Sequence, residues 1–177
     1  MPATVVITET NGTLAAQVEN VDPANINMGS DDSPEIVPAT YPITAQADGH
    51  AFEKWLRMYV SNIGDATIID NLKIWLSSLG GGWKTGEGWS ANLRESGYVQ
   101  MSYNTGGPIE TDSADADQAM PEAEPSGPNL GISGSLGGQI TSSPNYSDWC
   151  VLQMDISNLT PAGSVNQKTI TFQYDEQ

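Results

Sequence analysis

The sequence predicts an all-β protein: a two-sheet antiparallel sandwich with one long loop excursion. Short runs that alternate between apolar and polar residues recur along the chain, and this alternation is the periodicity of a half-buried strand. Turn-forming residues separate these runs, consistent with a content of 18 Gly and 11 Pro. No long segment has a convincing helical periodicity. Many short strands divided by turn clusters are typical of sandwiches.

The length predicts a single domain. The 177 residues suit one ordinary domain, so we expect one sandwich over residues 1–177. Hydrophobic residues make up 38% of the chain, which is enough for a thin two-layer core. We expect about seven strands with Greek-key connections between the sheets.

The first third of the chain is predicted to hold a hairpin and an irregular connection. A β-branched strand over residues 4–9 precedes the turn dipeptide Asn11-Gly12, and an alternating run follows over 13–19. Four prolines between residues 22 and 42 indicate a mostly extended, irregular connection. Short strands are expected within and after it, at 26–28, 35–37 and 43–46.

The clearest strands are predicted over residues 52–61 and 68–77. The turn at residues 62–65 favours strands over a helix for the first run, although Phe52, Leu56 and Tyr59 also match helical spacing. The two strands form either a hairpin or a corner between the sheets. The side chains expected to point inward are Leu56, Met58 and Val60 on the first and Leu72, Ile74 and Leu76 on the second, with Trp55, Arg57, Tyr59, Lys73 and Trp75 on the opposite faces.

The second half contains the excursion and the last strands. Residues 79–88 form a glycine-dense loop around Trp83, and residues 98–103 are a further strand candidate. The Gly/Pro/acid-rich excursion covers residues 104–147, where Leu130, Ile132, Leu136 and Ile140 are able to supply a short strand or two. Strands are then expected at 148–157, with Cys150, Leu152, Met154 and Ile156 on one face, and at 168–175, with Ile170, Phe172 and Tyr174 inward.

The charge excludes several classes of partner. Six Lys and Arg stand against 22 Asp and Glu, a net charge of −16. Nucleic acids and anionic membranes both bind basic surfaces, so neither is expected here. No apolar window is long enough to span a bilayer, and the N-terminus lacks the basic and apolar regions of a secretory signal.

Catalytic and metal-binding chemistry has few candidate residues. Cys150 and His50 are the only residues of their types, which leaves no disulfide framework, thiolate zinc site or multi-histidine site. No resident cofactor is expected. Asp112, Asp115 and Asp117 alternate like the ligands of a calcium loop, but the glycine of an EF-hand is absent. The alternatives are a structural calcium site and a solvated acidic loop, and the same pair applies to the cluster Asp31, Asp32 and Glu35.

The five tryptophans allow two interpretations. Exposed indoles are able to stack on sugars, and Trp75 and Trp149 lie out of phase with the most apolar face of their strands. Alternatively, the tryptophans pack under the loops or against another subunit. Trp83 and Trp89, in and beside the glycine-dense loop, are the best placed for either role.

Two stretches carry a family resemblance. Residues 61–78 (SNIGDATIIDNLKIWLSS) resemble a strand–turn–strand of immunoglobulin-like sandwiches, and residues 160–176 (TPAGSVNQKTITFQYDE) resemble the closing segment of such modules. With the acidity and the near-absence of Cys and His, the chain is similar to virion structural proteins of tailed bacteriophages that have this fold. The resemblance implies capsid decoration or a neck or tail adaptor, and no catalytic residue.

These observations predict a non-enzymatic structural component of a phage virion, assembled in the host cytoplasm. It would contact other virion proteins and copies of itself. An alternative is a carbohydrate-binding module that uses exposed tryptophans. The residues predicted to make contacts are Trp83, Trp89, Glu110, Asp112, Asp115 and Asp117.

Overall fold

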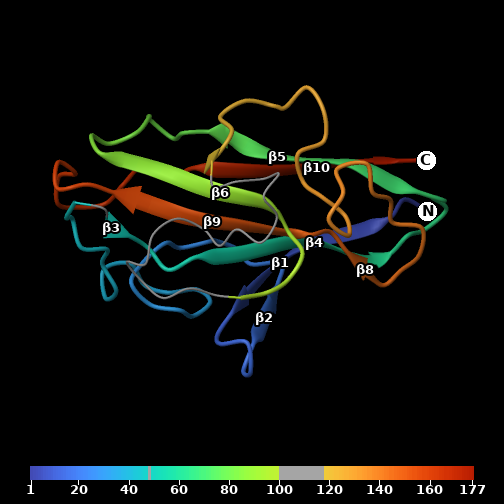
Figure 1. Cartoon of the computed structure of the whole chain (residues 1–177), viewed down its shortest axis with the longest axis horizontal. Coiled ribbons are helices and arrows are strands. Elements are labelled where there is room, and N and C mark those ends of the chain that lie inside the picture. The colour runs from blue at the N-terminus through green and yellow to red at the C-terminus, as the bar shows by residue number, and fades with distance from the viewer. Residues whose placement is uncertain (48, 100–117) are drawn as a thin grey trace.

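A computed structural model describes residues 1–47, 49–99 and 118–177 (Figure 1). Every regular element in these ranges is a strand, and none of their residues forms a helix that could cross a membrane. The strands are β1 (Thr4–Asn11), β2 (Val18–Val21), β3 (Gly49–His50), β4 (Lys54–Asn62), β5 (Ile69–Ser78), β6 (Glu87–Glu95), β7 (Gln118–Ala119), β8 (Asn145–Tyr146), β9 (Trp149–Ile156) and β10 (Thr169–Glu176). The all-β prediction is confirmed.

The strands form two antiparallel sheets of unequal width. The larger has eight strands in the order β2-β1-β4-β9-β6-β7, with β3 beside β9 and β8 beside β4. The smaller contains only β5 and β10. β4 and β5 therefore belong to different sheets, and the turn between them is a corner rather than a hairpin. Gly64 makes this corner possible, because its φ of 66° is one that residues with a side chain rarely adopt.

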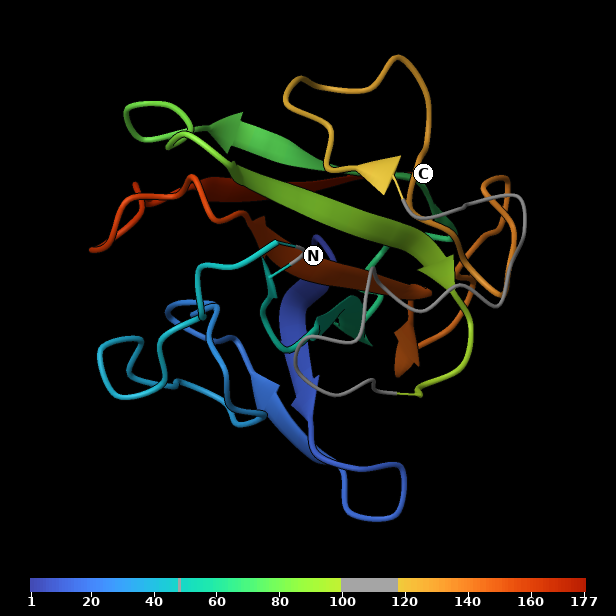
Figure 2. The same ribbon diagram turned by 60° about the vertical axis from the view of Figure 1, so that its left-hand side comes forward.

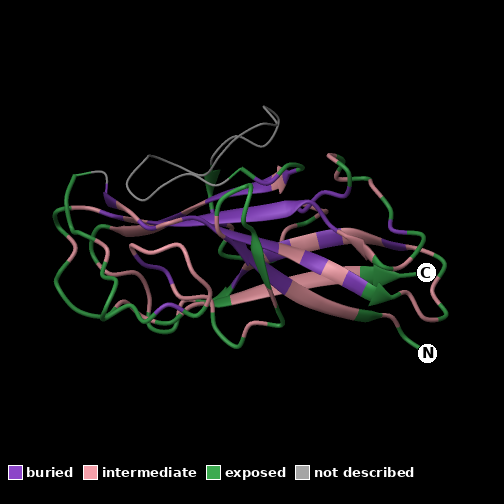
Figure 3. Ribbon diagram, turned by 90° about the horizontal axis from the view of Figure 1, so that it is seen from below, coloured by how far each residue is buried: buried purple, intermediate pink, exposed green. Residues whose placement is uncertain are grey.

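The main core lies between the two sheets and follows the predicted alternation. Leu56, Met58 and Val60 of β4 are at most 1% exposed, as are Leu72, Ile74 and Leu76 of β5. The inward residues of β9, which are Cys150, Leu152, Met154 and Ile156, are buried with them. Figure 3 shows the buried residues gathered along the central strands and the exposed ones in the connecting loops.

The larger sheet is also buried on its outer face. Trp55 of β4 and Trp149 of β9 form a second apolar cluster with Val151 and Tyr98. The Trp55 ring lies edge-on to the rings of Tyr98 and Trp149, with centroids 4.8 and 5.9 Å away. Of the two interpretations of the tryptophans, packing holds for Trp149, which is 6% exposed because the segment after β6 brings Tyr98 over this face.

Several predicted boundaries were wrong. Residues 87–95, treated in part as a glycine loop, form the nine-residue strand β6. The run 13–19 is mostly a turn, in which Ala16 N donates to Thr13 O, and its strand spans only Val18–Val21. No regular strand forms at the three short runs predicted between residues 26 and 46. Most of the strand candidate 98–103 lies outside the described residues.

The described part of the excursion closes one edge of the smaller sheet. Leu76 N of β5 donates to Pro121 O, and the Asn129 side chain bonds both the N–H and the C=O of Ile74. Farther along, Ile69 pairs with Ile140. Leu130, Ile132 and Ile140 are buried. Figure 2 shows this segment arching beyond β5, so residues 118–147 complete the core.

Candidate functional site

The tryptophans predicted as contact residues have different surroundings. Trp89 starts the buried face of β6 and is 8% exposed, so it is a core residue. Trp83 is half-buried at the end of the sandwich. Of the other three, Trp55 and Trp149 are buried and Trp75 is half-buried on the outer face of β5. Trp83 and Trp75 are therefore the indoles that reach the surface.

Trp83 lies where three segments meet. Its indole N–H donates to Glu122 Oε1 at 2.9 Å, which joins the loop after β5 to the excursion. The Lys168 ammonium lies 4.6 Å from the centre of the ring, a cation–π contact from the loop before β10. The Asn166 amide of the same loop donates to Gly82 O at 2.8 Å. These contacts hold the indole in one position.

An ion pair underlies this cluster. The Lys168 ammonium bonds Glu87 Oε1, and the two side chains are 1% and 0% exposed. The second Glu87 oxygen accepts from Lys84 N at 2.9 Å, so the carboxylate also fixes the glycine-dense loop. Lys168 donates to Asn166 O as well. We call Trp83, Glu87, Glu122, Asn166 and Lys168 the Trp83 cluster.

The predicted acidic residues fall into two groups along the chain. Glu110, Asp112, Asp115 and Asp117 lie outside the described residues. Within the described ranges, no group of three or more His, Cys, Asp or Glu side chains is arranged to hold a metal ion. In the second predicted acidic cluster, Asp32 accepts from Gly12 N and Asp31 from Ser33 Oγ. Asp32 thus bonds the turn that follows β1, and Asp31 bonds a neighbouring side chain.

His50 belongs to a small polar chain on the outer face. His50 Nδ1 lies 2.6 Å from one oxygen of Asp155, and the Ser90 hydroxyl donates to the other. Asp155 is thus the central group. In a Ser-His-Asp triad the histidine is central and takes the proton of the serine. The arrangement around Asp155 joins β3, β6 and β9 and gives Ser90 no histidine base.

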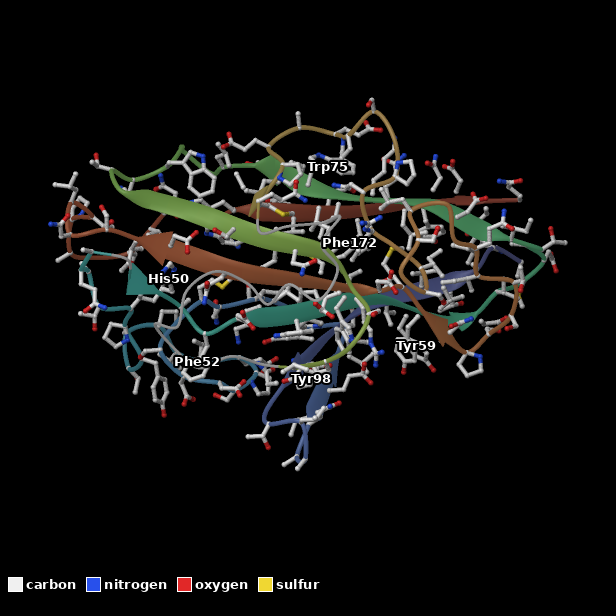
Figure 4. The ribbon with its side chains drawn as sticks, in the orientation of Figure 1. His50, Phe52, Tyr59, Trp75, Tyr98 and Phe172 are labelled. Carbon is white, nitrogen blue, oxygen red and sulfur yellow. The ribbon has the colours of Figure 1, made fainter. Side chains whose placement is uncertain are left out.

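A row of aromatic rings, not predicted from the sequence, runs beside the second apolar cluster. The Arg57 guanidinium stacks over the rings of Tyr146 and Trp149, 3.6 and 4.0 Å from their centres, and donates to Glu19 at 3.0 Å. Tyr59, labelled in Figure 4, stacks on Tyr146 with centroids 4.6 Å apart. Burial raises the pKa of Tyr146, and the nearby Glu19 carboxylate adds to the effect. The row anchors β8 to β4.

Two hollows of the described surface have mixed polar and apolar linings. One of about 320 Å³ lies at the end of the smaller sheet and is lined by Asp70, Asn71, Gly137, Gly138, Asp175 and Gln177. Another of about 370 Å³ lies beside it, around both ends of the described chain. Neither contains the apolar lining with convergent polar groups that is typical of small-molecule sites.

Comparisons of the chain with protein-family models, curated proteins and solved structures give no match.

Proposed function

We propose that the chain is a non-enzymatic structural component of a phage virion, built on an immunoglobulin-like sandwich and acting through protein–protein contacts. Its place is at the capsid surface or in the neck or tail, and its partners are other virion proteins and copies of itself. The proposal rests on the sequence resemblance together with the strand order and the contact surfaces of the fold.

The strand order supports the immunoglobulin-like part of this proposal. The six long strands in chain order are β1, β4, β5, β6, β9 and β10. Numbered one to six, they form one sheet in the order 1-2-5-4 and a second sheet that pairs 3 with 6. A constant-type immunoglobulin domain has the same 1-2-5-4 sheet, and its other sheet is 3-6-7.

The observation that carries the contact function is the projecting β1–β2 hairpin. This hairpin extends away from the body of the molecule (Figure 1). Leu14, Val18 and Val21 on it are between 53% and 66% exposed. Apolar side chains on a projecting edge strand suit a neighbouring protein surface more than water. The half-buried indole of Trp83, held in place by its cluster, supplies an aromatic anchor of the type enriched at interfaces.

Particle fractionation tests the proposal. Particles of a phage whose genome encodes the chain are purified on a density gradient. Mass spectrometry then measures the amount of the chain relative to the capsid protein. Multiple copies per particle that persist in high salt are expected. A Trp83→Ala chain should incorporate less, with Trp75→Ala as the control indole. Recovery of the chain only in the unassembled fractions would refute the structural role.

The carbohydrate-binding alternative has less support. Trp55, Trp89 and Trp149 are buried, and Lys168 already stacks on Trp83. A tryptophan fluorescence change on adding oligosaccharides, lost in Trp83→Ala, would favour this alternative over the structural role.

A further inference from the structure

The two edges of the smaller sheet differ. The excursion closes the β5 edge through bonds to Leu76, Ile74 and Leu72. Backbone groups of β5 that point to the excursion point away from β10, so these residues occupy non-hydrogen-bonded positions of the β5–β10 ladder. Their partners on β10 include Ile170, opposite Leu76, and Phe172, opposite Ile74.

The main-chain groups of Ile170 and Phe172 therefore point to the outer edge of β10. In an antiparallel pair, opposed residues at a non-hydrogen-bonded position direct their N–H and C=O groups away from each other. No backbone hydrogen bond joins these groups to any residue in the described ranges. Among the described residues, the outer edge of the eight-residue strand β10 is thus open at Ile170 and Phe172.

The apolar core is open on the same side. Ile170 and Phe172 are half-buried, whereas their partners Leu76 and Ile74 on β5 are at most 1% exposed. The larger sheet shows the same decrease, because Val5 and Ile7 of β1 are half-buried. Their partners on β4, Val60 and Met58, are at most 1% exposed. Phe172 is labelled in Figure 4. In each sheet, burial thus decreases from the inner strand to the outer one. This decrease is expected if the outer strand lacks a further neighbour.

The strand order locates the same gap. In the immunoglobulin-like order proposed above, the described strands supply 3 and 6 of the second sheet, and strand 7 would pair with the outer edge of β10. The free hydrogen-bonding edge, the half-buried apolar residues and the topology all point to one additional strand.

Charge selects the occupant. The charged residues of β10 are Asp175 and Glu176, both exposed, and Asp70 of β5 lies opposite Asp175 in the ladder. Lys168, just before the strand, is already paired with Glu87. A second copy of a chain with a net charge of −16 would bring further negative charge to this edge.

We infer that the open edge of β10 accepts an extended segment of a basic partner protein as an added strand. Alternate apolar residues of the segment enter between β1 and β10, and its Lys or Arg residues face Asp175 and Glu176. Main-chain bonds supply affinity in such strand addition, and the side chains at alternate positions supply specificity. This inference rests on the proposed fold and gives the proposed contact function a specific surface and a class of partner.

Amide hydrogen exchange on the full chain tests it. In the free protein, the amides of Ile170 and Phe172 are expected to exchange fast, while those of Thr171 and Gln173, which face β5, are protected. The probe is a ten-residue peptide. Its six central residues alternate between valine and threonine, and two lysines stand at each end. It should slow exchange at Ile170 and Phe172 at least tenfold. The same peptide with a central proline should not.

Two matched variants test the charge selection. Glu176→Lys should weaken binding of the lysine peptide about tenfold, and Glu35→Lys, an exposed acid away from this edge, should leave it unchanged. A peptide with glutamate in place of lysine should bind the wild-type chain more weakly than the lysine peptide. Equal binding of the two peptides would overturn the basic partner.

Other outcomes overturn the inference or separate it from the proposed virion role. Protection of Ile170 and Phe172 at the lowest protein concentration without peptide would mean that the chain closes its own edge. If amide protection and the mass measured by light scattering both increase with protein concentration, the occupant of the edge is a second copy of the chain. If the peptide adds as a strand but the chain is absent from particles, the virion role is refuted and this inference stands. If the chain is incorporated into particles but the peptide gives no protection, this inference is refuted and the virion role stands.

Discussion

The buried ion pair between Lys54 and Glu9 gives the sharpest test of the core. Both side chains are fully buried, and Lys54 Nζ lies 2.8 Å from Glu9 Oε1 and 3.0 Å from Ser33 O. The strand register places Lys54 beside Leu152 and Glu9 beside Leu56, so the pair lies on the core face of the larger sheet. We predict that Lys54→Met strongly destabilises the fold.

The magnitude follows from the environment of the carboxylate. Removing one partner of a buried pair leaves an uncompensated charge and costs about 3–5 kcal/mol. Glu9 Oε2 has no hydrogen-bond partner among the described residues, so the carboxylate is incompletely satisfied even with Lys54 present. Replacing both groups by apolar residues of similar size removes two desolvated charges. The double variant Glu9→Met/Lys54→Met should therefore be about as stable as the wild type, or more so.

Urea unfolding at neutral pH, followed by tryptophan fluorescence, measures these differences. The matched control is Lys73→Met. Lys73 Nζ lies 2.9 Å from Glu124 Oε1, but the Glu124 side chain is 53% exposed. A pair this exposed contributes about 1 kcal/mol at most. A loss of free energy of unfolding in Lys54→Met no larger than in Lys73→Met would contradict the predicted cost of the unpaired charge. So would a double variant as unstable as Lys54→Met.

Three further predictions concern the core and the loops. Burial raises the pKa of the Cys150 thiol well above its ordinary range, so the folded state loses stability as the pH rises past the ordinary thiol pKa of about 8.5. Urea titrations between about pH 8.5 and 10 should show this loss as a decrease in the free energy of unfolding of about 1.4 kcal/mol per pH unit. Cys150→Ala should lack this decrease, and an equal dependence on pH in both proteins would contradict the prediction. Trp89→Ala should cost about 3–5 kcal/mol, because it leaves a cavity in the core, whereas Trp83→Ala should cost less in thermal unfolding; the opposite order would place Trp89 outside the core. Gly80→Ala should lower stability by about 1–2 kcal/mol or more, because φ is +58° and a Cβ would collide with a backbone carbonyl. In Gly127→Ala the added Cβ meets open space, so this control variant should be near neutral in the same assay.

The sequence alone determined the inward-facing residues of the strands. Leu72, Ile74 and Leu76 alternate with polar or larger residues, and a period of two puts them on one face whatever the neighbouring strand is. The same holds for the apolar positions of β4, β9 and β10. β6 is not predicted from the sequence, and one reason is that Gly88 and Asn92, which lie between its apolar residues, are of types depleted in strands. The alternation of Trp89, Ala91 and Leu93 was the signal that could have identified it.

The candidate site was predicted only in part. The glycine-dense loop indicated Trp83, because glycines allow a loop to present a large side chain. Its partners Glu122 and Lys168 come from segments 39 and 85 residues away in the chain, and local sequence has no information on that contact. The burial of Trp149 was decided in the same way, by a ring at Tyr98 that reaches it from another segment.

Local periodicity determines which face of a strand is apolar, because that depends only on neighbouring residues. Which strands pair, and which edges remain open, depends on contacts between distant segments. β5 and β10 have similar alternating sequences, yet the excursion closes the edge of one and no described residue bonds the edge of the other. Hydrogen-bonding groups occur on every backbone, so only the tertiary structure shows which of them lack a partner.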